Sequence, residues 1–389
     1  MKKILKIFLI LSCFIMLTGC KLYVYEIGDN QNNSSSGDSS SQLTQSGTGT
    51  TIIKDNINYT GKITFTNEAP KEKKSWDVIY NQVKDSVVTI RNIVNGSISS
   101  TGSGVFFAED SVTNGYAYIF TNAHVVEGAS TIEVLLANGK LVQGYIVGYD
   151  KNEDVAVVQI EKRNDYSLAT LRVSNTLKIG EDILAIGSPI GEKYSDTANA
   201  GIISNLNIDI QPDNSSISLY LIQIDAALNP GNSGGPLFDN AGNLIGINSI
   251  KLLSSGTTTD IEGFNYAIPI SHFALVAEHL LQGSLYYRPF LNISIYDVRY
   301  LTFSEREKYD LTINNGLLLV EIGNNSPLKN KTSIGNVITH IEGIEILKAN
   351  DFSVELLKYS PDDTITLTIS SPDGTNVKNI DITLIKRTN

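Results

Sequence analysis

The sequence predicts a mostly β fold organised as a barrel or a sandwich. Between Ser86 and Ile250 the chain is a succession of short β-rich runs separated by turn signals, with little helical periodicity. Asn138-Gly139 is typical of a hairpin turn, and Asp239-Asn240-Ala241-Gly242 is a second turn signal. Short strands joined in this way favour a closed or two-layered β architecture.

Helices are predicted on either side of this β-rich region. Trp76–Val83 has the pattern of a short amphipathic helix. After the region, Ser271 offers an N-cap for a helix that stops at Gly283. This second helix has one apolar stripe, formed by Phe273, Val276, Ala277, Leu280 and Leu281. The stripe predicts that the helix packs on the second barrel of the β structure.

A serine flanked by glycines is the first candidate functional residue. Residues 229–237 read Asn-Pro-Gly-Asn-Ser-Gly-Gly-Pro-Leu. The glycine at position 231 lets the backbone turn so that the N–H groups of Gly231 and Ser233 can form an oxyanion hole. The string is also compatible with a simple turn between strands. Ser233 is therefore predicted as a nucleophile only together with a base and an acid elsewhere in the chain.

His124 is the candidate base among the four histidines. A serine hydroxyl needs an adjacent imidazole, which in turn needs a carboxylate to hold its tautomer. His124 follows the apolar run Tyr118–Phe120, where a strand leaves a core. His272, His279 and His340 have the pattern of ordinary surface or packing residues. No metal site is expected, because neither a third ligand at suitable spacing nor a His-Glu-x-x-His motif accompanies them.

Asp154 is the candidate acid. It follows the histidine in the chain and stands at the mouth of a buried strand, Val155–Ile160. Its neighbours Asp150 and Glu153 are expected to be solvated turn carboxylates. A solvated carboxylate is also the alternative for Asp154, and position alone does not decide between the two.

Three motifs in this order resemble the HtrA/Deg branch of chymotrypsin-like serine proteases. They are Thr-Asn-Ala-His-Val-Val around His124, Asp-Val-Ala-Val from Asp154 and Gly-Asn-Ser-Gly-Gly-Pro-Leu around Ser233, with further agreement at Gly102–Val105, Ala185–Gly191, Ala200–Ser204 and Phe264–Pro269. The resemblance covers roughly residues 76–389. It implies a chymotrypsin-like double β-barrel with the triad His124, Asp154 and Ser233 in the cleft, followed by a small α/β PDZ-like domain. It also implies a homotrimer.

The substrate pocket is expected to be apolar. In the fold that the resemblance implies, its floor is set six residues before the serine, at Ala227, and Leu228 is expected to narrow it. Such a pocket should accept Val, Ala or Ile, because a lysine or arginine would be desolvated without a partner. The strand Gly246–Ile250 is expected to pair with the substrate backbone. This strand contributes the remaining predicted pocket residues, Gly246, Ile247, Asn248 and Ser249.

The first 20 residues resemble a bacterial lipoprotein signal peptide. Lys2, Lys3 and Lys6 precede the apolar run Ile7–Leu17, which is too short to span a bilayer and ends in Leu-Thr-Gly-Cys. The resemblance implies cleavage before Cys20 and lipidation of its thiol. The protein would then be attached to the outer face of a bacterial membrane.

Residues 21–75 are predicted to form a disordered tether. Gln31–Thr51 consists mainly of Ser, Gly, Thr, Asn and Gln, which cannot bury enough apolar area to fold. The whole chain carries a formal net charge of -11, which argues against nucleic acid as a partner. The expected organisation is a signal peptide (1–20), the tether (21–75), a protease domain (76–285) and a PDZ-like domain (288–389).

Residues 288–389 resemble the PDZ domain of the same family. The resemblance rests on Gly316–Val320, Ser326-Pro327, Ile334–Ile338 and a helical Asp351–Tyr359, with a closing hairpin predicted at Asp373-Gly374. The loop for a peptide carboxylate should be Phe290, Leu291, Asn292 and Ile293. The family usually has glycine where Asn292 stands. Because asparagine tolerates a left-handed backbone, peptide binding and a purely structural domain both remain open.

The sequence therefore predicts a lipid-anchored, extracytoplasmic serine endopeptidase with acyl-enzyme chemistry at Ser233 and no cofactor. The resemblance implies unfolded or damaged proteins as substrates, and C-terminal peptides as ligands of the PDZ-like domain. The alternative is a membrane-tethered chaperone or adaptor whose triad is latent. The intact motifs favour the enzyme.

Overall fold

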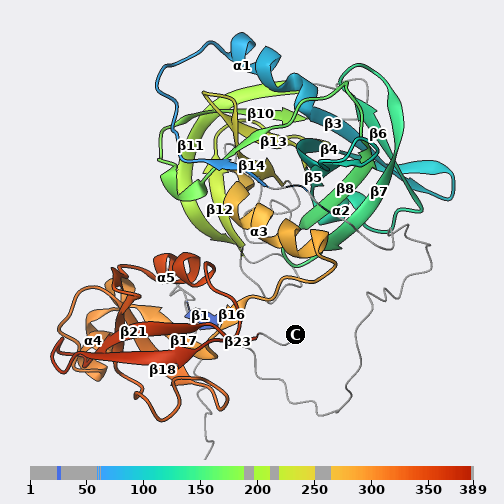
Figure 1. The fold of residues 1–389 in the computed structure, drawn as a ribbon. Coiled ribbons are helices and arrows are strands. Elements are labelled where there is room, and N and C mark those ends of the chain that lie inside the picture. The colour runs from blue at the N-terminus through green and yellow to red at the C-terminus, as the bar shows by residue number, and fades with distance from the viewer. Residues whose placement is uncertain are drawn as a thin grey trace, which may run out of the picture. The chain divides into compact units, whose positions relative to one another are not determined.

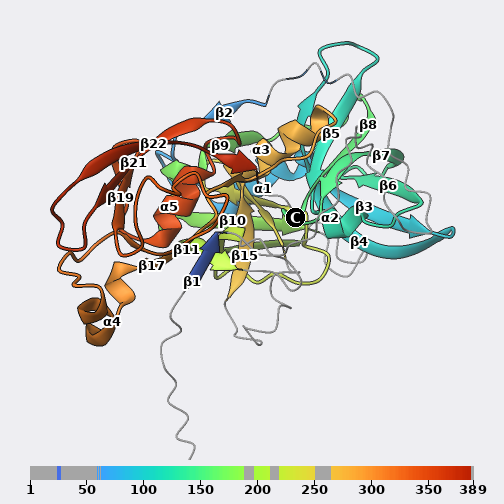
Figure 2. The same ribbon diagram turned by 90° about the horizontal axis from the view of Figure 1, so that it is seen from below.

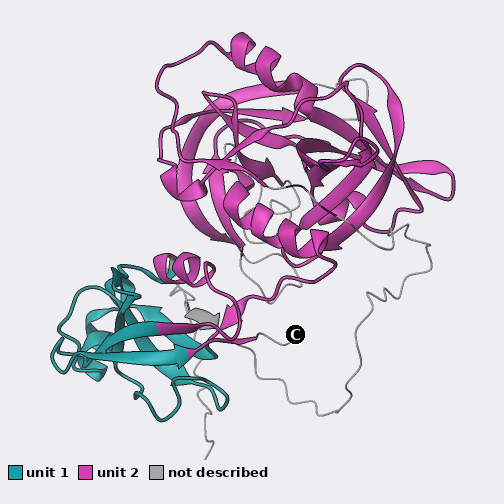
Figure 3. Ribbon diagram, viewed as in Figure 1, with its two compact units in different colours: residues 1–28, 291–349, 366–382 teal, residues 29–290, 350–365, 383–389 magenta. Residues whose placement is uncertain are grey.

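The computed structural model describes residues 24–27, 59, 61, 63–187, 197–210, 219–249 and 264–386. These residues form two compact units, which are coloured separately in Figure 3. The larger unit contains the described residues from 59 to 290 together with 350–365 and 383–386. The smaller unit contains residues 24–27, 291–349 and 366–382.

Six antiparallel strands close the first barrel of the larger unit, in the order β3-β4-β5-β8-β7-β6 (Figure 1). They are β3 (Val87–Val94), β4 (Ser97–Glu109), β5 (Tyr116–Thr121), β6 (Thr131–Leu136), β7 (Leu141–Asp150) and β8 (Val155–Glu161). In β6 every second residue is buried, namely Ile132, Val134 and Leu136. This alternation directs one face of the strand into the barrel core. The predicted turn at Asn138-Gly139 joins β6 to β7, and Gly139 has the expected positive φ of 81°.

A second six-stranded barrel follows in the same unit, in the order β13-β10-β11-β12-β15-β14, and is closed by the pairing of β13 with β14. Its strands are β10 (Asp182–Gly187), β11 (Thr197–Ile210), β12 (Leu219–Ile224), β13 (Pro236–Asp239), β14 (Asn243–Asn248) and β15 (Asn265–Pro269). Two short strands, β9 (Thr170–Arg172) and β2 (Phe65–Thr66), extend this sheet through parallel pairs. The predicted mostly β fold with two barrels is thus confirmed.

Three helices belong to the larger unit's barrels: α1 (Trp76–Val83), α2 (Ala123–Val126) and α3 (Ile270–Leu281). The predicted helix Trp76–Val83 is confirmed. In α3 the predicted apolar stripe is buried, and the helix packs against strands of both barrels (Figures 1 and 2). Among the described residues, no helix has both the length and the apolar character that crossing a bilayer requires.

The prediction that Ser271 is the N-cap of α3 is wrong. Pro269 occupies the N-cap position, and Ser271 lies inside the first turn. Its hydroxyl accepts a hydrogen bond from the backbone N–H of Ser174 at 2.9 Å. The Ser271 side chain therefore links α3 to the segment that contains Ser174 and does not cap its own helix. Gly283, with a φ of 70°, follows the helix as predicted.

The prediction that residues 21–75 are disordered throughout is also wrong. Tyr59 packs edge-on against Tyr118, with ring centroids 5.0 Å apart. Ile63 is only 6% exposed and joins the core shared by the two barrels. Phe65-Thr66 pairs with β9. These apolar side chains are buried by tertiary contacts that a composition argument does not consider. The stretch Gln31–Thr51, on which that argument rested, lies outside the described residues.

The smaller unit is built on a sheet in the order β1-β17-β18-β19-β21-β22, with β20 beside β19. Its strands are β1 (Val24–Ile27), β17 (Ile293–Asp297), β18 (Leu317–Ile322), β19 (Val337–Ile341), β20 (Ile344–Glu345), β21 (Thr364–Ser370) and β22 (Lys378–Thr383). The predicted hairpin at Asp373-Gly374 joins β21 to β22, and Gly374 has a φ of 78°.

The remaining α-helices and strands of the described residues are α4 (Phe303–Lys308), α5 (Ala349–Leu356) and the antiparallel pair β16 (Pro289–Phe290) with β23 (Ile385–Lys386). The predicted helix Asp351–Tyr359 corresponds to α5, which begins and ends earlier in the chain. Strand β1 pairs with one edge of β17, in a register that sets Tyr25 opposite Ile295. The other edge of β17 is taken by β18.

Candidate active site

His124 and Asp154 are in direct contact. His124 lies in α2, immediately after β5, and Asp154 ends the turn between β7 and β8. The ring Nδ1 of His124 is 2.8 Å from Oδ1 and 3.0 Å from Oδ2 of Asp154. The backbone N–H of His124 also donates to Oδ1, at 3.2 Å. A carboxylate can only accept here, so Nδ1 carries a proton, and in the neutral form of the ring Nε2 is the nitrogen with a lone pair.

The backbone of Asp154 is held in a left-handed conformation. Its φ is 54°, a value that few residues other than glycine, asparagine and aspartate adopt readily. The side chain of Asn122 donates to its carbonyl oxygen at 2.9 Å, and both residues are buried. Because the backbone is fixed in this way, the carboxylate is aimed at the imidazole.

Ser249 provides a contact that the sequence did not predict. It follows β14 and is fully buried, and its hydroxyl donates to Oδ2 of Asp154 at 2.8 Å. It was predicted as a wall of the substrate pocket. Its hydroxyl instead orients the acid, and no local pattern around position 249 indicates a partner 95 residues away.

Ser233 lies in the loop between β12 and β13 and is attached to the first barrel through Ser103 of β4. The N–H of Ser103 donates to the carbonyl of Ser233 at 2.8 Å, and its hydroxyl donates to the carbonyl of Gly231 at 2.7 Å. The carbonyl of Ser103 in turn accepts from the hydroxyl of Thr121, three residues before His124. The serine loop is thus fastened beside the segment that carries His124.

Gly234 shows how close this approach is. A Cβ atom at Gly234 would lie 2.2 Å from the carbonyl oxygen of Ser103 and 2.3 Å from Oγ1 of Thr121. Gly234 also has a φ of 82°. Both the space and the conformation therefore require glycine directly after Ser233.

The predicted oxyanion residue Gly231 has a φ of 103°, which glycine adopts without strain. Its carbonyl is held by Ser103, as described above, and the N–H of Asn232 donates to the carbonyl of Asn229 at 2.9 Å. These bonds fix the backbone of the loop just before Ser233.

The predicted pocket residues do not all lie at a surface. Ala227 is exposed, and its carbonyl accepts from the side chain of Asn199 at 2.7 Å. Leu228 is buried in the core of the second barrel, so little of its side chain is left to narrow a pocket. The prediction that it does so is therefore corrected.

The prediction that Gly246, Ile247 and Asn248 pair with substrate is wrong. These residues of β14 are already paired with β13 or β15: Gly246 and Ile247 with both strands, and Asn248 with Ala267 of β15. Asn248 also donates to Gly235 through its N–H and accepts from Gly234 through its carbonyl. No edge remains for another chain. Ile250, the last residue of the predicted strand, lies outside the described residues.

Asp150 and Glu153 are buried, which corrects the prediction of solvated carboxylates. Glu153 is 1% exposed and Asp150 is 8% exposed. The Oδ1 atom of Asp150 accepts the N–H groups of Asn152 and Glu153 and so closes the turn. Burial, and then the charge of Glu153, raises the pKa of the Asp150 carboxyl. His272, expected to be an ordinary histidine, contacts Glu153 at 2.7 Å.

In the predicted peptide-carboxylate loop, Asn292 adopts a left-handed conformation with a φ of 49°. Its carbonyl accepts the N–H of Gly323, and its side chain donates to Asn325. Leu291 and Ile293 are buried, as is Phe290. Asparagine thus takes the conformation in which glycine was expected, as the sequence argument allowed.

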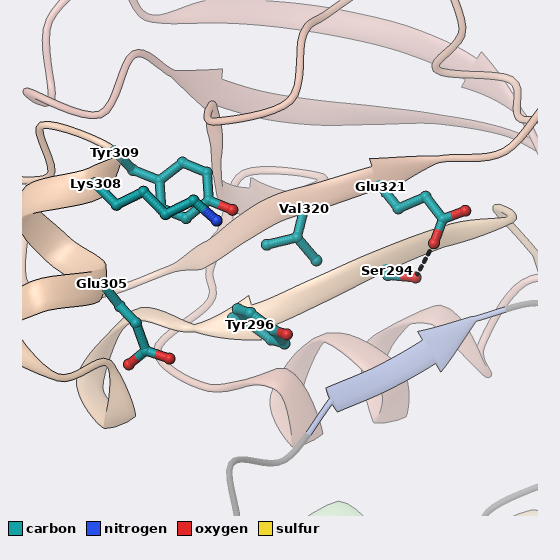
Figure 4. A pocket seen from close by; sticks show the side chains of 7 residues that line it. All are labelled: Ser294, Tyr296, Glu305, Lys308, Tyr309, Val320 and Glu321. Atoms are coloured by element: carbon teal, nitrogen blue, oxygen red, sulfur yellow. Dashed lines mark hydrogen bonds between the residues drawn. The ribbon is translucent and has the colours of Figure 1, made fainter.

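An open hollow of about 520 Å³ lies on the smaller unit between β17, β18 and α4 (Figure 4). Its lining consists of Ser294, Tyr296, Glu305, Lys308, Tyr309, Val320 and Glu321. Two of these residues are hydrogen-bonded to each other, because the hydroxyl of Ser294 donates to Glu321 at 3.2 Å. Within the described part of the chain, no three acidic, histidine or cysteine side chains gather in a way that could hold a metal ion.

Comparison with known proteins agrees with this geometry. Residues 102–247 match the family model of the trypsin-like peptidase domain. The chain is 32% identical over 311 residues to the serine protease Do-like HtrA of Lactobacillus helveticus. The alignment covers 79% of this chain and 73% of that relative. It is 36% identical over 295 residues to the serine protease Do-like HtrB of Bacillus subtilis, covering 74% of this chain and 62% of that relative.

Among solved structures, the HtrA-type protease AlgW with a tripeptide is similar, at 27% identity and a TM-score of 0.63 over 81% of this chain and 98% of that one. The matched peptidase region contains His124, Asp154 and Ser233. Both the fold and the sequence matches identify a serine protease. The chain belongs to the HtrA family of trypsin-like serine proteases.

Proposed function

We propose that this protein is a lipid-anchored, extracytoplasmic endopeptidase that degrades unfolded or damaged proteins through an acyl-enzyme on Ser233. One observation carries the catalytic part of the proposal. The imidazole of His124 is fixed by Asp154, and Ser103 fastens the loop of Ser233 beside the same segment. This arrangement suits a base that takes a proton from a serine hydroxyl.

In the first step, the hydroxyl oxygen of Ser233 attacks the carbonyl carbon of the peptide bond while Nε2 of His124 accepts the hydroxyl proton. The imidazolium that forms stays hydrogen-bonded to Asp154, which lowers its free energy without taking the proton. Ser249 donates to the other oxygen of that carboxylate and keeps it from turning away.

The tetrahedral intermediate carries a negative oxygen. The N–H groups of Gly231 and Ser233 are the proposed donors to it, because the positive φ of Gly231 and its fixed carbonyl set the direction of this backbone. Collapse of the intermediate passes the proton from His124 to the leaving amine. Water activated by the same imidazole then hydrolyses the ester.

The proposed substrates are unfolded chains with Val, Ala or Ile before the cleaved bond, since Ala227 offers no charge to a lysine or arginine. The similar protease AlgW has been solved with a tripeptide and with a decapeptide. We extend peptide binding to this chain as part of the proposal. Mass spectrometry of digestion fragments tests the preference, and a majority of cuts after basic residues would contradict it.

C-terminal peptides are the proposed ligands of a PDZ-like domain formed by the smaller unit. An extended peptide recognised by such a domain adds a strand to a sheet edge. In this structure β18 and β1 take the two edges of β17. A peptide would therefore have to displace β1 to reach β17.

The proposed location rests on the sequence around Cys20, which lies outside the described residues. Lipidation there would hold the protein on the outer face of a bacterial membrane. Cells expressing the full chain should incorporate labelled fatty acid into it, and a Cys20→Ser variant should not. A labelled Cys20→Ser variant would contradict the proposal. A homotrimer is also proposed, from the family resemblance, and light scattering of the purified protein would measure it.

The function is tested by degradation of casein by the full chain beside a Ser233→Ala variant. We expect cleavage by the parent and a rate on the order of a million-fold lower for the variant. If neither protein degrades casein, even with C-terminal hydrophobic peptides added, the enzyme proposal fails and a tethered chaperone replaces it. A chaperone would suppress aggregation equally well with either residue at position 233.

A further inference from the structure

Glu153, the residue directly before Asp154, is the centre of a buried ion cluster. Its carboxylate is 2.7 Å from Nε and 2.7 Å from Nη2 of Arg288, one contact to each oxygen. Nε2 of His272 lies 2.7 Å from Oε2. The three groups come from the turn after β7, from α3 and from the segment after α3. One carboxylate thus joins three parts of the larger unit.

The cluster is almost closed to water. The side chains of Glu153, Arg288 and His272 are 2%, 10% and 13% exposed. Burial alone raises the pKa of Glu153 most strongly, yet the charge of Arg288, that of His272 and their hydrogen bonds together bring it well below its usual range. Burial lowers the pKa of Arg288, and the Glu153 carboxylate more than reverses this. Both members of the pair are therefore charged in the folded protein.

This pair is held in one geometry. A guanidinium that meets a carboxylate through two parallel N–H bonds is fixed in orientation as well as in distance. Loss of either partner would leave the other charge buried and uncompensated, which is far more costly than losing an exposed ion pair. The position of Glu153 thus depends on Arg288.

Asp154 and Glu153 are joined by one peptide unit. A displacement of Glu153 would therefore also move the backbone of Asp154. Its φ of 54° belongs to a sparsely populated region, and such conformations are maintained by contacts with the surrounding structure. On one side the carboxylate is bound by His124 and Ser249. On the other side the ion cluster anchors the preceding residue. If Glu153 were released, rotation of the peptide unit between Glu153 and Asp154 would turn the Asp154 carboxylate relative to Nδ1 of His124.

We propose that Glu153 is a positioning residue for the His124–Asp154 pair and that Arg288 keeps it in place. The inference rests on the proposed roles of His124 and Asp154. Arg288 is three residues before Leu291, where the chain enters the smaller unit. Through Arg288 and Glu153, the position of the connecting segment, residues 282–290, thereby affects the orientation of the Asp154 carboxylate.

The test uses the full chain and four variants: Arg288→Met, Arg288→Lys, Glu153→Gln and the double variant Glu153→Gln/Arg288→Met. The probes are fluorescently labelled casein, for kcat and KM, and a fluorophosphonate, for the rate of Ser233 labelling. Thermal unfolding of each protein establishes that it is folded at the assay temperature. All rates are expressed per labelled active site.

Arg288→Met should lower kcat ten- to a hundredfold with KM within about twofold, because the acid is misaligned while substrate contacts are kept. The double variant should recover stability, since it buries no uncompensated charge, but kcat should stay low because residue 153 still lacks its anchor. Arg288→Lys should be intermediate, because an ammonium keeps the charge but not the two-point geometry. If Arg288→Met does not fold, the comparison of Arg288→Lys with wild type decides alone.

Arg172→Met is the matched control. Arg172 is fully buried and is bonded to Glu181 and Asp239 beside strands of the second barrel. Its loss should lower the midpoint of unfolding and leave kcat per active site unchanged. If Arg288→Met, or Arg288→Lys where the first does not fold, behaves in the same way as this control, the Glu153 cluster is only structural and the proposal is overturned. If wild type neither cleaves casein nor reacts with the fluorophosphonate, the proposed function itself fails and the positioning role falls with it.

Discussion

The hydroxyl of Ser249 donates to Oδ2 of Asp154 across 2.8 Å and so joins the second barrel to the first at the proposed catalytic acid. Ser249 follows β14, and Asp154 ends the turn after β7. His124 contacts the same carboxylate from its own segment. The acid is therefore oriented by both barrels, and its alignment depends on how the barrels pack.

Ser249→Ala should lower kcat/KM roughly ten- to a hundredfold, because a hydrogen bond to a charged group contributes about 1.5–3 kcal/mol. Hydrolysis of labelled casein measures the effect. Ser130→Ala is the control, since its hydroxyl donates only to the backbone carbonyl of Ile93. Equal activity of the two variants would show that Asp154 keeps its orientation without Ser249.

Asp154→Asn should lower kcat by about 10⁴, as expected when the histidine loses its tautomer-fixing carboxylate. Asparagine tolerates the φ of 54°, so the midpoint of unfolding should change little. Asp154→Ala should lose both activity and stability, because alanine adopts this conformation at a cost of about 1–2 kcal/mol. A Asp154→Asn variant with more than about a tenth of wild-type activity would remove Asp154 from the catalytic role.

Gly234→Ala should abolish fluorophosphonate labelling of Ser233 and destabilise the protein. The added Cβ would collide with the backbone oxygen of Ser103, which cannot swing aside as a side chain could. Gly283→Ala is the matched control, because Gly283 also has a positive φ but no neighbour within 4 Å of a new Cβ. The control isolates the conformational cost of about 1–2 kcal/mol. Normal labelling of Gly234→Ala would mean that the loop around Ser233 can shift to accommodate a Cβ atom at position 234.

Stability should fall in acid through the titration of Glu153. The folded-state pKa of this carboxyl lies below the ordinary 4.5, so it stabilises the fold above that pH, and the contribution is lost as the pH falls through the folded-state value. Asp150 works in the opposite direction, because its pKa is raised. Arg288, His272 and Tyr286 are the other titratable groups that face the Glu153 carboxyl.

The measurement is the unfolding midpoint of wild type and Glu153→Gln from about pH 3 to pH 7. Wild type should be the more stable protein near neutral pH, and the difference should shrink below about pH 4.5. Parallel curves would show that Glu153 does not carry the acid sensitivity.

Features set by neighbouring residues could be predicted from the sequence. The helix Trp76–Val83 follows from its own periodicity, and the turn at Gly139 follows from two adjacent residues. His124, Asp154 and Ser233 stand in short motifs that describe their own backbone surroundings. The structure brings these three segments together as the order of the motifs implies.

Features set by distant partners could not be predicted. The sequence around Glu153 indicates an exposed turn residue. Its burial follows from Arg288, a partner 135 positions later in the chain. Ile63 sits in a polar stretch, and only the barrels explain its burial. The prediction that β14 pairs with substrate was wrong for the same reason, since the sequence of a strand does not reveal which of its edges already pair with other strands.

The Glu153–Arg288 pair also bears on where the chain can be cut and joined to a relative. A boundary drawn at residue 285 leaves Arg288 with the other unit, whereas the ion pair assigns it to the barrels. A chimera joined between Arg288 and Pro289 would keep this pair and also keep β16 with β23. Exchange of the segment that follows, by recombination or in the laboratory, should therefore keep the Glu153–Arg288 pair at that junction and lose it at a junction a few residues earlier.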